Sequence, residues 1–229
     1  MKAIINTPTP SLVQSIDFYQ KLNFEIVNDN DLTYACSGPL IILINEKRSA
    51  RAGIIFYNDD WTQVSSELDK KYSTIEIENG ILTCDPNGVV VSLYSMDHFP
   101  SISVSKEVNS IAGNFHGLSI EAFNFQKSLD FWQIFDYKID MGSAAGGWVA
   151  MSNSTGIGIG MMKFNMCPHL FFNPSFTYFN SGNNLPVIQA IRDKGITITE
   201  EITHFNKEGI VDNIIIRDPG GFGFFIFND

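Results

Sequence analysis

Two hexapeptides, SIDFYQ at residues 15–20 and SLDFWQ at residues 128–133, are versions of one motif repeated 113 residues apart. The register continues without a gap, because NFEI at residues 23–26 is matched by DYKI at residues 136–139. Self-similarity at a fixed offset is the sequence signature of a structural repeat. The chain is therefore predicted to consist of two homologous halves.

A second motif recurs near the end of each half. DPNG at residues 85–88 and DPGG at residues 218–221 each precede an apolar run, and they lie 133 residues apart. The second half thus carries about 20 extra residues between its two motifs. We predict a first domain over residues 1–95, a serine-rich linker over residues 96–113, and a second domain over residues 114–229.

Apolar patterning predicts the order of elements within each half. Short apolar runs bounded by Asn, Asp, Gly and Pro indicate strands, whereas apolar residues three and four apart indicate helices. Helices are predicted after Ser11, after Asp59 or Asp60, from about Phe125 and from about Leu185. The predicted order is one strand, one helix and three strands, and this order occurs four times along the chain. The sequence therefore predicts an α+β protein of four βαβββ modules.

Composition and charge exclude several classes of protein. The chain has 229 residues, of which 44% are hydrophobic and only 17% charged, and this excludes intrinsic disorder. Its formal net charge of -10 argues against a nucleic-acid partner. No apolar run approaches the roughly 18 residues that span a bilayer, so no membrane partner is predicted. An odd set of cysteines without a CxxC motif, Cys36, Cys84 and Cys167, indicates reduced thiols and a cytoplasmic protein.

The two motifs together resemble those of the vicinal oxygen chelate superfamily, which includes glyoxalases, bleomycin resistance proteins and extradiol dioxygenases. The family pattern is S-x-x-F-Y on the first helix and D-P-x-G before the last strand of a paired unit, and both halves match it in order. The resemblance covers nearly the whole chain and extends to two-domain glyoxalase-like proteins in particular. It implies two glyoxalase/bleomycin-resistance-like domains with cupped mixed sheets. It leaves open whether the modules pair within a half or between the halves.

The resemblance also implies where a divalent metal ion would bind. Members that hold a metal use His or Gln on a first strand and Glu on a last strand. The corresponding first-strand positions here are Ile4 and Gly117, and the last-strand positions are Ser92 and Phe225. None of these is a metal ligand of the family, so the sequence predicts degenerate metal sites and no cofactor, with a divalent metal ion as the alternative.

His116 lies one residue from the family's ligand position. By strand alternation His116 shares the core-facing side of Leu118. Gly117 and Ser119 instead face the concave side of the sheet, which we call the cup. A bulge would return His116 to the cup face. His116 is accordingly the candidate for a metal ligand, and Glu121 is the catalytic candidate because a buried carboxylate can serve as a general base.

Alternation also predicts which side chains contact a ligand. The first cup contributes Ser92 and Tyr94. The second contributes a larger and more aromatic set, namely Ser119, Glu121, Trp148, Phe176, Tyr178 and Phe225.

Two further sequence patterns resemble functional sites. Cys167 and His169 are interpreted as structural, since no second pair lies nearby. GIGIG at residues 156–160 continues a strand and lacks the following helix of a dinucleotide site. Its small residues would instead let a ligand or a neighbouring chain approach the sheet.

We therefore expect a protein that binds a small apolar or aromatic molecule without metal-dependent catalysis. The alternative is a metal-dependent lyase or dioxygenase with a shifted site built on His116 and Glu121. A third interpretation is that the modules serve as a dimerisation scaffold, which would make the protein a homodimer.

Overall fold

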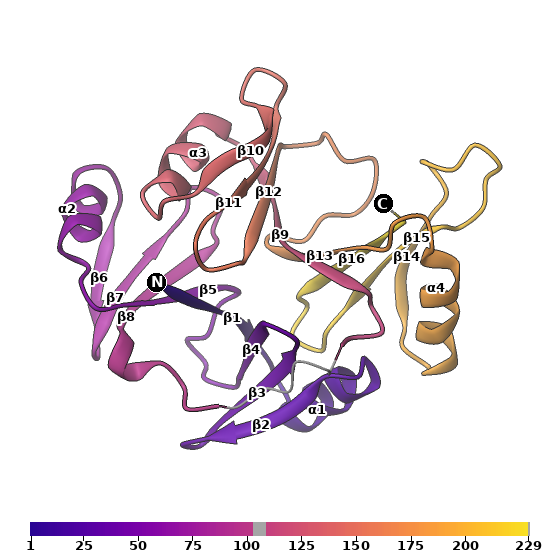
Figure 1. The fold of residues 1–229 in the computed structure, drawn as a ribbon, viewed down its shortest axis with the longest axis horizontal. Coiled ribbons are helices and arrows are strands. Elements are labelled where there is room, and N and C mark those ends of the chain that lie inside the picture. Colours follow the sequence, from indigo (N-terminus) through magenta and orange to yellow (C-terminus); the bar gives the residue numbers. More distant parts are fainter. Residues whose placement is uncertain (103–108, 229) are drawn as a thin grey trace.

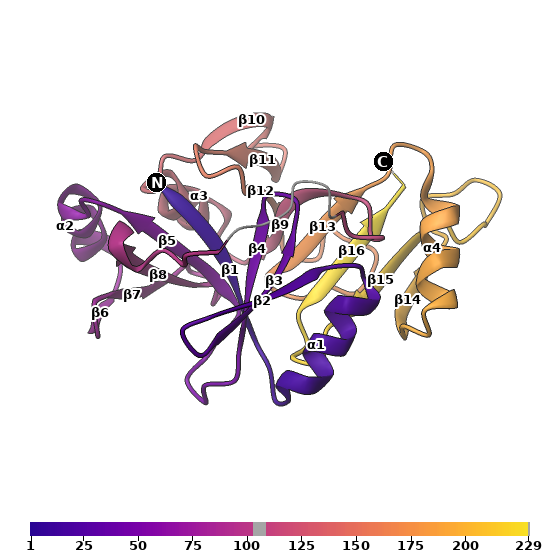
Figure 2. The same cartoon turned by 60° about the horizontal axis from the view of Figure 1, so that its bottom comes forward.

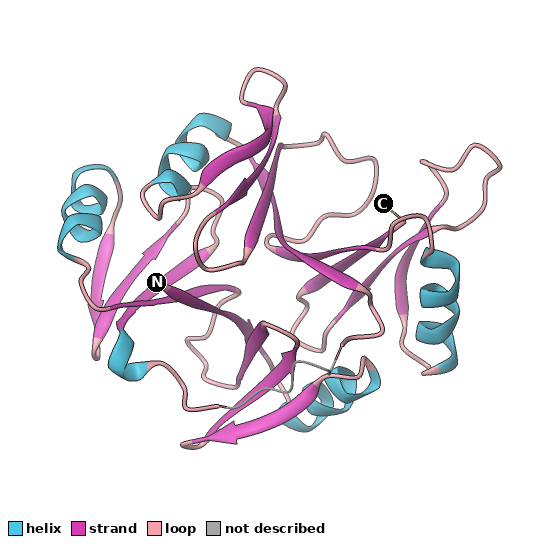
Figure 3. Cartoon of the chain, in the orientation of Figure 1, coloured by secondary structure: helices cyan, strands magenta, loops and turns pink. Residues whose placement is uncertain are grey.

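The computed structural model describes residues 1–102 and 109–228, and its strands form two eight-stranded mixed sheets (Figure 1). The predicted linker over residues 96–113 lies partly outside these residues, at 103–108. Figure 3 shows helices at the margin of the view and strands across its middle. None of the helices in the described ranges has the length and apolar character needed to cross a bilayer.

The first sheet is built by residues of the first half alone. Its strand order is β2-β3-β4-β1-β5-β8-β7-β6, with β1 parallel to β4, β5 parallel to β8, and β1 antiparallel to β5 where the two modules meet. The elements are β1 (Lys2–Pro8), α1 (Leu12–Lys21), β2 (Glu25–Asp29), β3 (Leu32–Ser37), β4 (Leu40–Asn45), β5 (Gly53–Asn58), α2 (Thr62–Lys71), β6 (Thr74–Ile77), β7 (Gly80–Cys84) and β8 (Val90–Ser95), followed by the short 3-10 helix η1 (Met96–His98).

The second sheet repeats this arrangement. Its order is β10-β11-β12-β9-β13-β16-β15-β14, with the same parallel and antiparallel pairs. The elements are β9 (Asn114–Ala122), α3 (Phe125–Gln133), β10 (Lys138–Ser143), β11 (Trp148–Ser152), β12 (Gly158–Lys163), β13 (Ser175–Phe179), α4 (Asn184–Asp193), β14 (Ile198–Ile202), β15 (Asn213–Arg217) and β16 (Gly223–Phe227).

This architecture confirms the predicted α+β fold of four βαβββ modules. The question of module pairing is also answered, because β1 pairs with β5 and β9 pairs with β13. Each half therefore completes its own sheet.

Local signals explain where the helices begin and end. Ser11 caps α1 by accepting a hydrogen bond from the Gln14 backbone N–H at 3.4 Å. Asp60 accepts from the Thr62 backbone N–H at 2.8 Å at the start of α2. Gly195 follows α4 with a φ of 65°, a left-handed conformation that favours glycine after a helix.

One apolar core is shared by the helix-facing sides of the two sheets. Phe56 of β5 stacks on Phe135, which follows α3, with ring centroids 5.1 Å apart. Phe18 of α1 packs edge-on against Phe224 of β16 at 5.5 Å. Accordingly, α1 lies beside β16 in Figure 2 although it belongs to the other half. The helix faces are buried between the halves, which leaves the opposite, cup-facing side of each sheet for other contacts.

The two repeated motifs meet across this shared core. The Tyr19 hydroxyl, from the first copy of S-x-x-F-Y, donates to the Asp218 carboxylate of the second D-P-x-G at 3.0 Å. In the reciprocal contact, Asn87 of the first D-P-x-G donates from its amide to the Ser128 hydroxyl of the second S-x-x-F motif. The motifs that reveal the repeat are therefore structural contacts between the halves.

Candidate ligand-binding cavity

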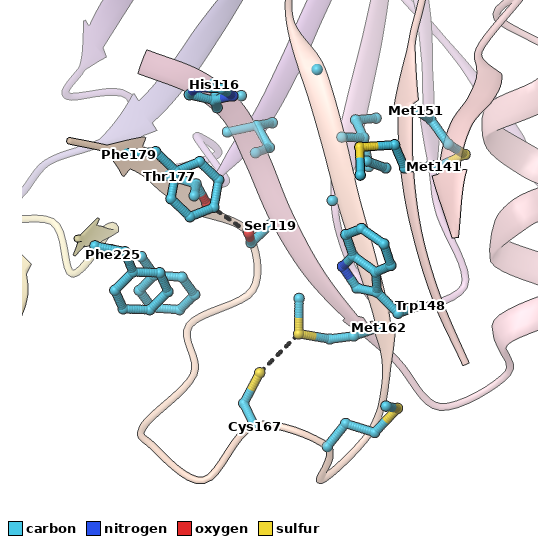
Figure 4. A pocket seen from close by; sticks show the side chains of 18 of the residues that line it. His116, Ser119, Met141, Trp148, Met151, Met162, Cys167, Thr177, Phe179 and Phe225 are labelled. Carbon is cyan, nitrogen blue, oxygen red and sulfur yellow. Dashed lines mark hydrogen bonds between the residues drawn. The ribbon is translucent and has the colours of Figure 1, made fainter. Parts of the chain in front are cut away.

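The cup face of the second sheet encloses a cavity of about 620 Å³. Its floor comes from β9, β11, β12, β13 and β16, and its wall is completed by the segment after β12 and by Phe205. Figure 4 shows Trp148 and Met141 on one side of this space and Phe179 and Phe225 on the other. The cavity therefore lies on the face of the sheet that the shared core does not use.

Small residues at the floor keep this cavity open. Gly160 of β12 lies between Ser119 of β9 and Ala150 of β11 in the sheet. A Cβ added at Gly160 would meet the Ser119 hydroxyl oxygen at 3.6 Å and the Leu118 carbonyl oxygen at 3.9 Å, which is ordinary van der Waals contact. The backbone therefore does not require glycine at this position, and its effect is to leave space above the sheet.

The equivalent positions of the first sheet carry large side chains. Leu43 of β4 takes the place of Gly160, and Tyr34 of β3 takes the place of Ala150, as the matching strand registers show. Both side chains are buried in an apolar cluster that fills the first cup together with Ile4, Cys36, Ile55 and Tyr57. Phe99 covers this cluster, with its ring edge-on to Tyr57 at 5.2 Å. The first cup is thus packed with its own side chains.

A β-bulge in β9 decides the direction of His116. Gly117 pairs with Thr177 but Phe115 pairs with Tyr178, so His116 is the extra residue of the bulge. Gly117 has a φ of 141°, a conformation that residues with a side chain rarely adopt. As a result His116 faces the cavity, where its ring lies 4.9 Å from that of Phe179.

Aromatic rings form one wall of the cavity. Phe225 and Phe227 of β16 are nearly parallel at 5.7 Å, and Phe171 meets Phe225 edge-on at 4.9 Å. His169 lies edge-on to Phe225 at 5.3 Å and to Phe227 at 5.4 Å. These contacts fix the rings relative to one another, so the wall is formed before a ligand enters.

A pair of hydroxyl groups lies at the centre of the floor. Ser119 of β9 and Thr177 of β13 form a hydrogen bond of 2.6 Å, and both residues are buried (Figure 4). In the first half the equivalent residues are Asn6 and Ile55. The hydroxyl pair is therefore a feature of the second cavity and has no counterpart in the first cup.

The remaining wall is rich in sulfur. The Cys167 thiol contacts the Met162 thioether sulfur at 2.8 Å, and Met141 and Met166 also line the cavity. Burial, together with the nearby Glu121 carboxylate, raises the pKa of the Cys167 thiol to about 11. The thiol therefore stays protonated at neutral pH and is a weak nucleophile.

The structure places some of the residues predicted for the second cup in the cavity and others in the shared core. Ser119, Trp148 and Phe225 line the cavity. Phe176 and Tyr178 lie in the shared core on the opposite face of β13, and Thr177 and Phe179 face the cavity instead. The predicted assignment of β13 residues is therefore wrong by one position. A shift of one residue along a strand moves each side chain to the opposite face of the sheet.

Glu121, Ser92 and Tyr94 lie apart from this cavity. Glu121 is buried near the far end of β9, and its backbone exchanges two hydrogen bonds with the Asn173 amide. Ser92 and Tyr94 belong to β8 in the first half, where Tyr94 stacks on Tyr57 of the filled cup at 6.0 Å.

Several lining residues come from a segment that sequence patterns do not interpret. Residues 164–174 join β12 to β13 and contribute Met166, Cys167, Pro168, His169 and Phe171 to the cavity. This segment has no helical or strand period that would predict its direction. The Cys167 and His169 pair was the available signal, but their sequence spacing does not show that both face one cavity.

Comparison with known proteins identifies the fold. No protein-family model matches the sequence, and no curated protein sequence matches it. Among solved structures, the 2,3-dioxygenase LapB from Pseudomonas sp. KL28 is similar over 100% of this chain and 92% of its own, with TM-score 0.63 and 15% identity. A Mn(II)-bound glyoxalase from Novosphingobium aromaticivorans is similar over 97% of this chain and 79% of its own, with TM-score 0.60 and 12% identity.

A third similar structure extends this result. Homoprotocatechuate 2,3-dioxygenase from Arthrobacter globiformis is similar over 100% of this chain and 79% of its own, with TM-score 0.64 and 12% identity. At these identities the likeness concerns the fold, and it agrees with the resemblance drawn from the two motifs.

These structures correct the expectation of a protein without a cofactor. One structure that shares the fold over nearly the whole chain is a Mn(II)-bound glyoxalase, so the fold is one that holds a metal ion. The expectation was wrong because it rested on the family's ligand positions alone, Ile4, Gly117, Ser92 and Phe225, and substitutions at these positions do not decide whether a protein uses a cofactor.

The described side chains of the second cavity lack the ligand set that a divalent metal ion needs. Within residues 1–102 and 109–228, no three or more His, Cys, Asp or Glu side chains gather where they could hold a metal ion. The floor positions that face one another carry Ser119, Thr177 and Phe225. Hydroxyl and phenyl groups do not match the imidazole and carboxylate ligands of such ions. These residues do not fit a divalent metal ion.

Proposed function

Since this chain has the two-domain fold of glyoxalases and extradiol dioxygenases, we propose that it binds a small apolar or aromatic molecule in the cavity of its second half. The cavity volume of about 620 Å³ supports this proposal, because pockets for small molecules usually measure about 300–1,000 Å³. Such pockets are mostly apolar with a few polar groups, and this lining has the same character.

The contrast between the two cups carries the proposal. Two sheets of one topology differ at their floor, where Leu43 and Tyr34 of the first are replaced by Gly160 and Ala150 of the second. An open apolar cavity costs stability, because its lining loses packing contacts. Occupation by a ligand would restore those contacts.

Exposed apolar side chains at the cavity also favour a ligand. Met141, Trp148 and Phe205 line the cavity and are 63%, 39% and 55% exposed. Large exposed apolar groups that gather around a cavity are typical of a binding site rather than of an ordinary surface. A bound molecule would remove part of this area from water.

The hydroxyl pair gives such a site a means of orientation. Ser119 and Thr177 bond to each other, which leaves hydroxyl lone pairs free to accept a further hydrogen bond. A ligand with a hydrogen-bond donor would be oriented by a bond from that donor to the hydroxyl pair.

Binding of a neutral environment-sensitive dye such as Nile red tests the proposal. We expect saturable fluorescence enhancement with one dye bound per chain. Gly160→Leu, which introduces the residue found at the equivalent position of the first cup, should abolish this binding because the new side chain enters the cavity.

The control is Ala145→Leu, which adds the same side chain at an exposed position that does not line the cavity. This variant should bind the dye as the wild type does. Equal binding by Gly160→Leu and wild type, with both folded by circular dichroism, would refute the proposal.

A further inference from the structure

The fixed charge of the described cavity lining is negative, and its two imidazoles, His116 and His169, carry no charge when neutral. Among the described residues that line it, Asp140 is the carboxylate, and the lining contains neither lysine nor arginine. The whole chain carries a formal charge of -10. An anionic ligand would lose its hydration in this cavity without gaining a fixed positive charge, and that desolvation is costly.

Asp140 faces the cavity because β10 is irregular at this residue. Ile139 pairs with Met151 and Met141 pairs with Ala150, so the register of β10 and β11 shifts at Asp140. A bulge of this kind turns consecutive side chains toward the same side of a sheet. Both Asp140 and Met141 accordingly line the cavity.

The aromatic rings supply a second feature that favours positive charge. The face of an aromatic ring carries partial negative charge and attracts a cation within about 6 Å. Trp148 lies across the cavity from Phe179 and Phe225, so a ligand between them would be adjacent to aromatic groups on two sides (Figure 4). The methionine sulfurs of the lining are polarisable and also tolerate a cation.

We propose that the ligand of this cavity is a hydrophobic organic cation, such as an ammonium group attached to an aromatic or aliphatic body. This inference rests on the proposed function and adds the charge of the ligand to it. The apolar body occupies the space above Gly160, and the positive charge lies among the rings on the side of Asp140. The cavity discriminates against carboxylates and phosphates of the same size.

Three small molecules of similar shape test the inference by displacement of Nile red. They are benzyltrimethylammonium, its neutral carbon analogue neopentylbenzene, and the anion 4-tert-butylbenzoate. The cation should displace the dye at a concentration about 5- to 30-fold lower than the neutral analogue, which corresponds to the usual strength of cation–aromatic attraction. The anion should be the weakest competitor.

A pair of aspartate variants locates the charge preference. Asp140→Asn should reduce the affinity for the cation about 3- to 10-fold and leave the affinity for the neutral analogue unchanged. Asp136→Asn is the matched control, because it makes the same change in net charge at an exposed residue that does not line the cavity. It should leave both affinities unchanged.

The outcomes separate this inference from the proposed function. If the dye binds but the neutral analogue or the anion competes as well as the cation, the charge preference is refuted and the cavity remains a binding site. An equal effect of Asp140→Asn and Asp136→Asn would likewise refute it. If the dye does not bind wild-type protein, the proposed function itself fails.

Discussion

The two cups of this molecule have the same strand order, but side chains fill the interior of the first and leave the interior of the second open. In the first, Leu43 and Tyr34 fill the space above the sheet, and Phe99 covers them. In the second, Gly160 and Ala150 occupy the equivalent positions, and a cavity of about 620 Å³ remains. The difference shows that side-chain volume at a few floor positions decides which cup is open.

The comparison also separates stability from binding within one chain. The first cup contributes a packed apolar cluster to the fold, whereas the second leaves aromatic and methionine side chains partly exposed. Since the two sheets share the core on their other faces, an open second cup does not prevent the molecule from having a continuous core.

The largest expected effect is the loss of packing in the first cup. Tyr34→Ala gives β3 the residue that β11 has at the equivalent position, and it removes a large side chain that is 3% exposed. The free energy of unfolding should fall by about 3–5 kcal/mol, as for other buried aromatic residues replaced by alanine. Urea denaturation measures this change through the transition midpoint.

Trp148→Ala is the matched control in the open cup. Trp148 lies on β11 and is 39% exposed, so its removal leaves less buried volume empty. The loss of stability should be less than half of that caused by Tyr34→Ala. Equal losses would contradict the distinction between a packed cup and an open one.

The second prediction concerns the contact between the halves. Burial raises the pKa of Asp218 from 3.8 to about 6, although hydrogen bonds from the Phe222 backbone and the Tyr19 hydroxyl oppose the shift. The folded state therefore holds the Asp218 proton more tightly than the unfolded state does. Stability from this group is complete below about pH 4 and is lost as the pH rises through 6, by about 3 kcal/mol.

Asp218→Asn should remove this part of the pH dependence. Urea unfolding between pH 4 and pH 7.5 would then give a difference between wild type and variant that changes with pH by about 2–3 kcal/mol. Asp136→Asn, at an exposed position, should leave the pH dependence unchanged. A constant difference between wild type and Asp218→Asn across this range would show that the carboxyl group does not titrate as described.

The repeated motifs explain how far the fold could be predicted. S-x-x-F-Y and D-P-x-G are contacts of the shared core, for instance between Tyr19 and Asp218, and such contacts depend on few residue types. The two motifs therefore remain recognisable in the sequence although the side chains of the two cups differ. The pairing of modules was not predictable, because either pairing buries the same apolar faces.

The third prediction tests the glycines of the second cup separately. A Cβ at Gly158 would lie 2.5 Å from the His116 carbonyl oxygen, whereas a Cβ at Gly160 has ordinary contacts. Gly158→Ala should destabilise the protein by about 1–3 kcal/mol because the backbone must move. Gly160→Ala should leave stability unchanged or increase it by about 0.5 kcal/mol. Comparable losses in both variants would mean that Gly160 is also required by the backbone.

The cavity was less predictable than the fold, and β9 and β13 show why. Alternation assigned Phe176 and Tyr178 to the cavity, but β13 presents Thr177 and Phe179. Alternation alone also assigned His116 to the core, and only the bulge at Gly117 turns it toward the cavity. A displacement of one residue changes every assignment on a strand, and the sequence does not give the register that would fix it.

The smallest expected effect concerns the hydroxyl pair that distinguishes the floor of the second cup. Ser119→Ala removes one partner of the 2.6 Å hydrogen bond and leaves the buried Thr177 hydroxyl without it. This should cost about 1–2 kcal/mol of stability. Thr177→Val should have a similar cost, but the double variant should lose less than the sum of the two, because it leaves no hydroxyl unpaired.

Chemical denaturation of the four proteins gives the coupling energy, and additive losses would show that the two hydroxyls do not interact. A coupling near 1 kcal/mol would instead identify the pair as a bonded polar floor that the first cup, with Asn6 and Ile55 at these positions, does not have.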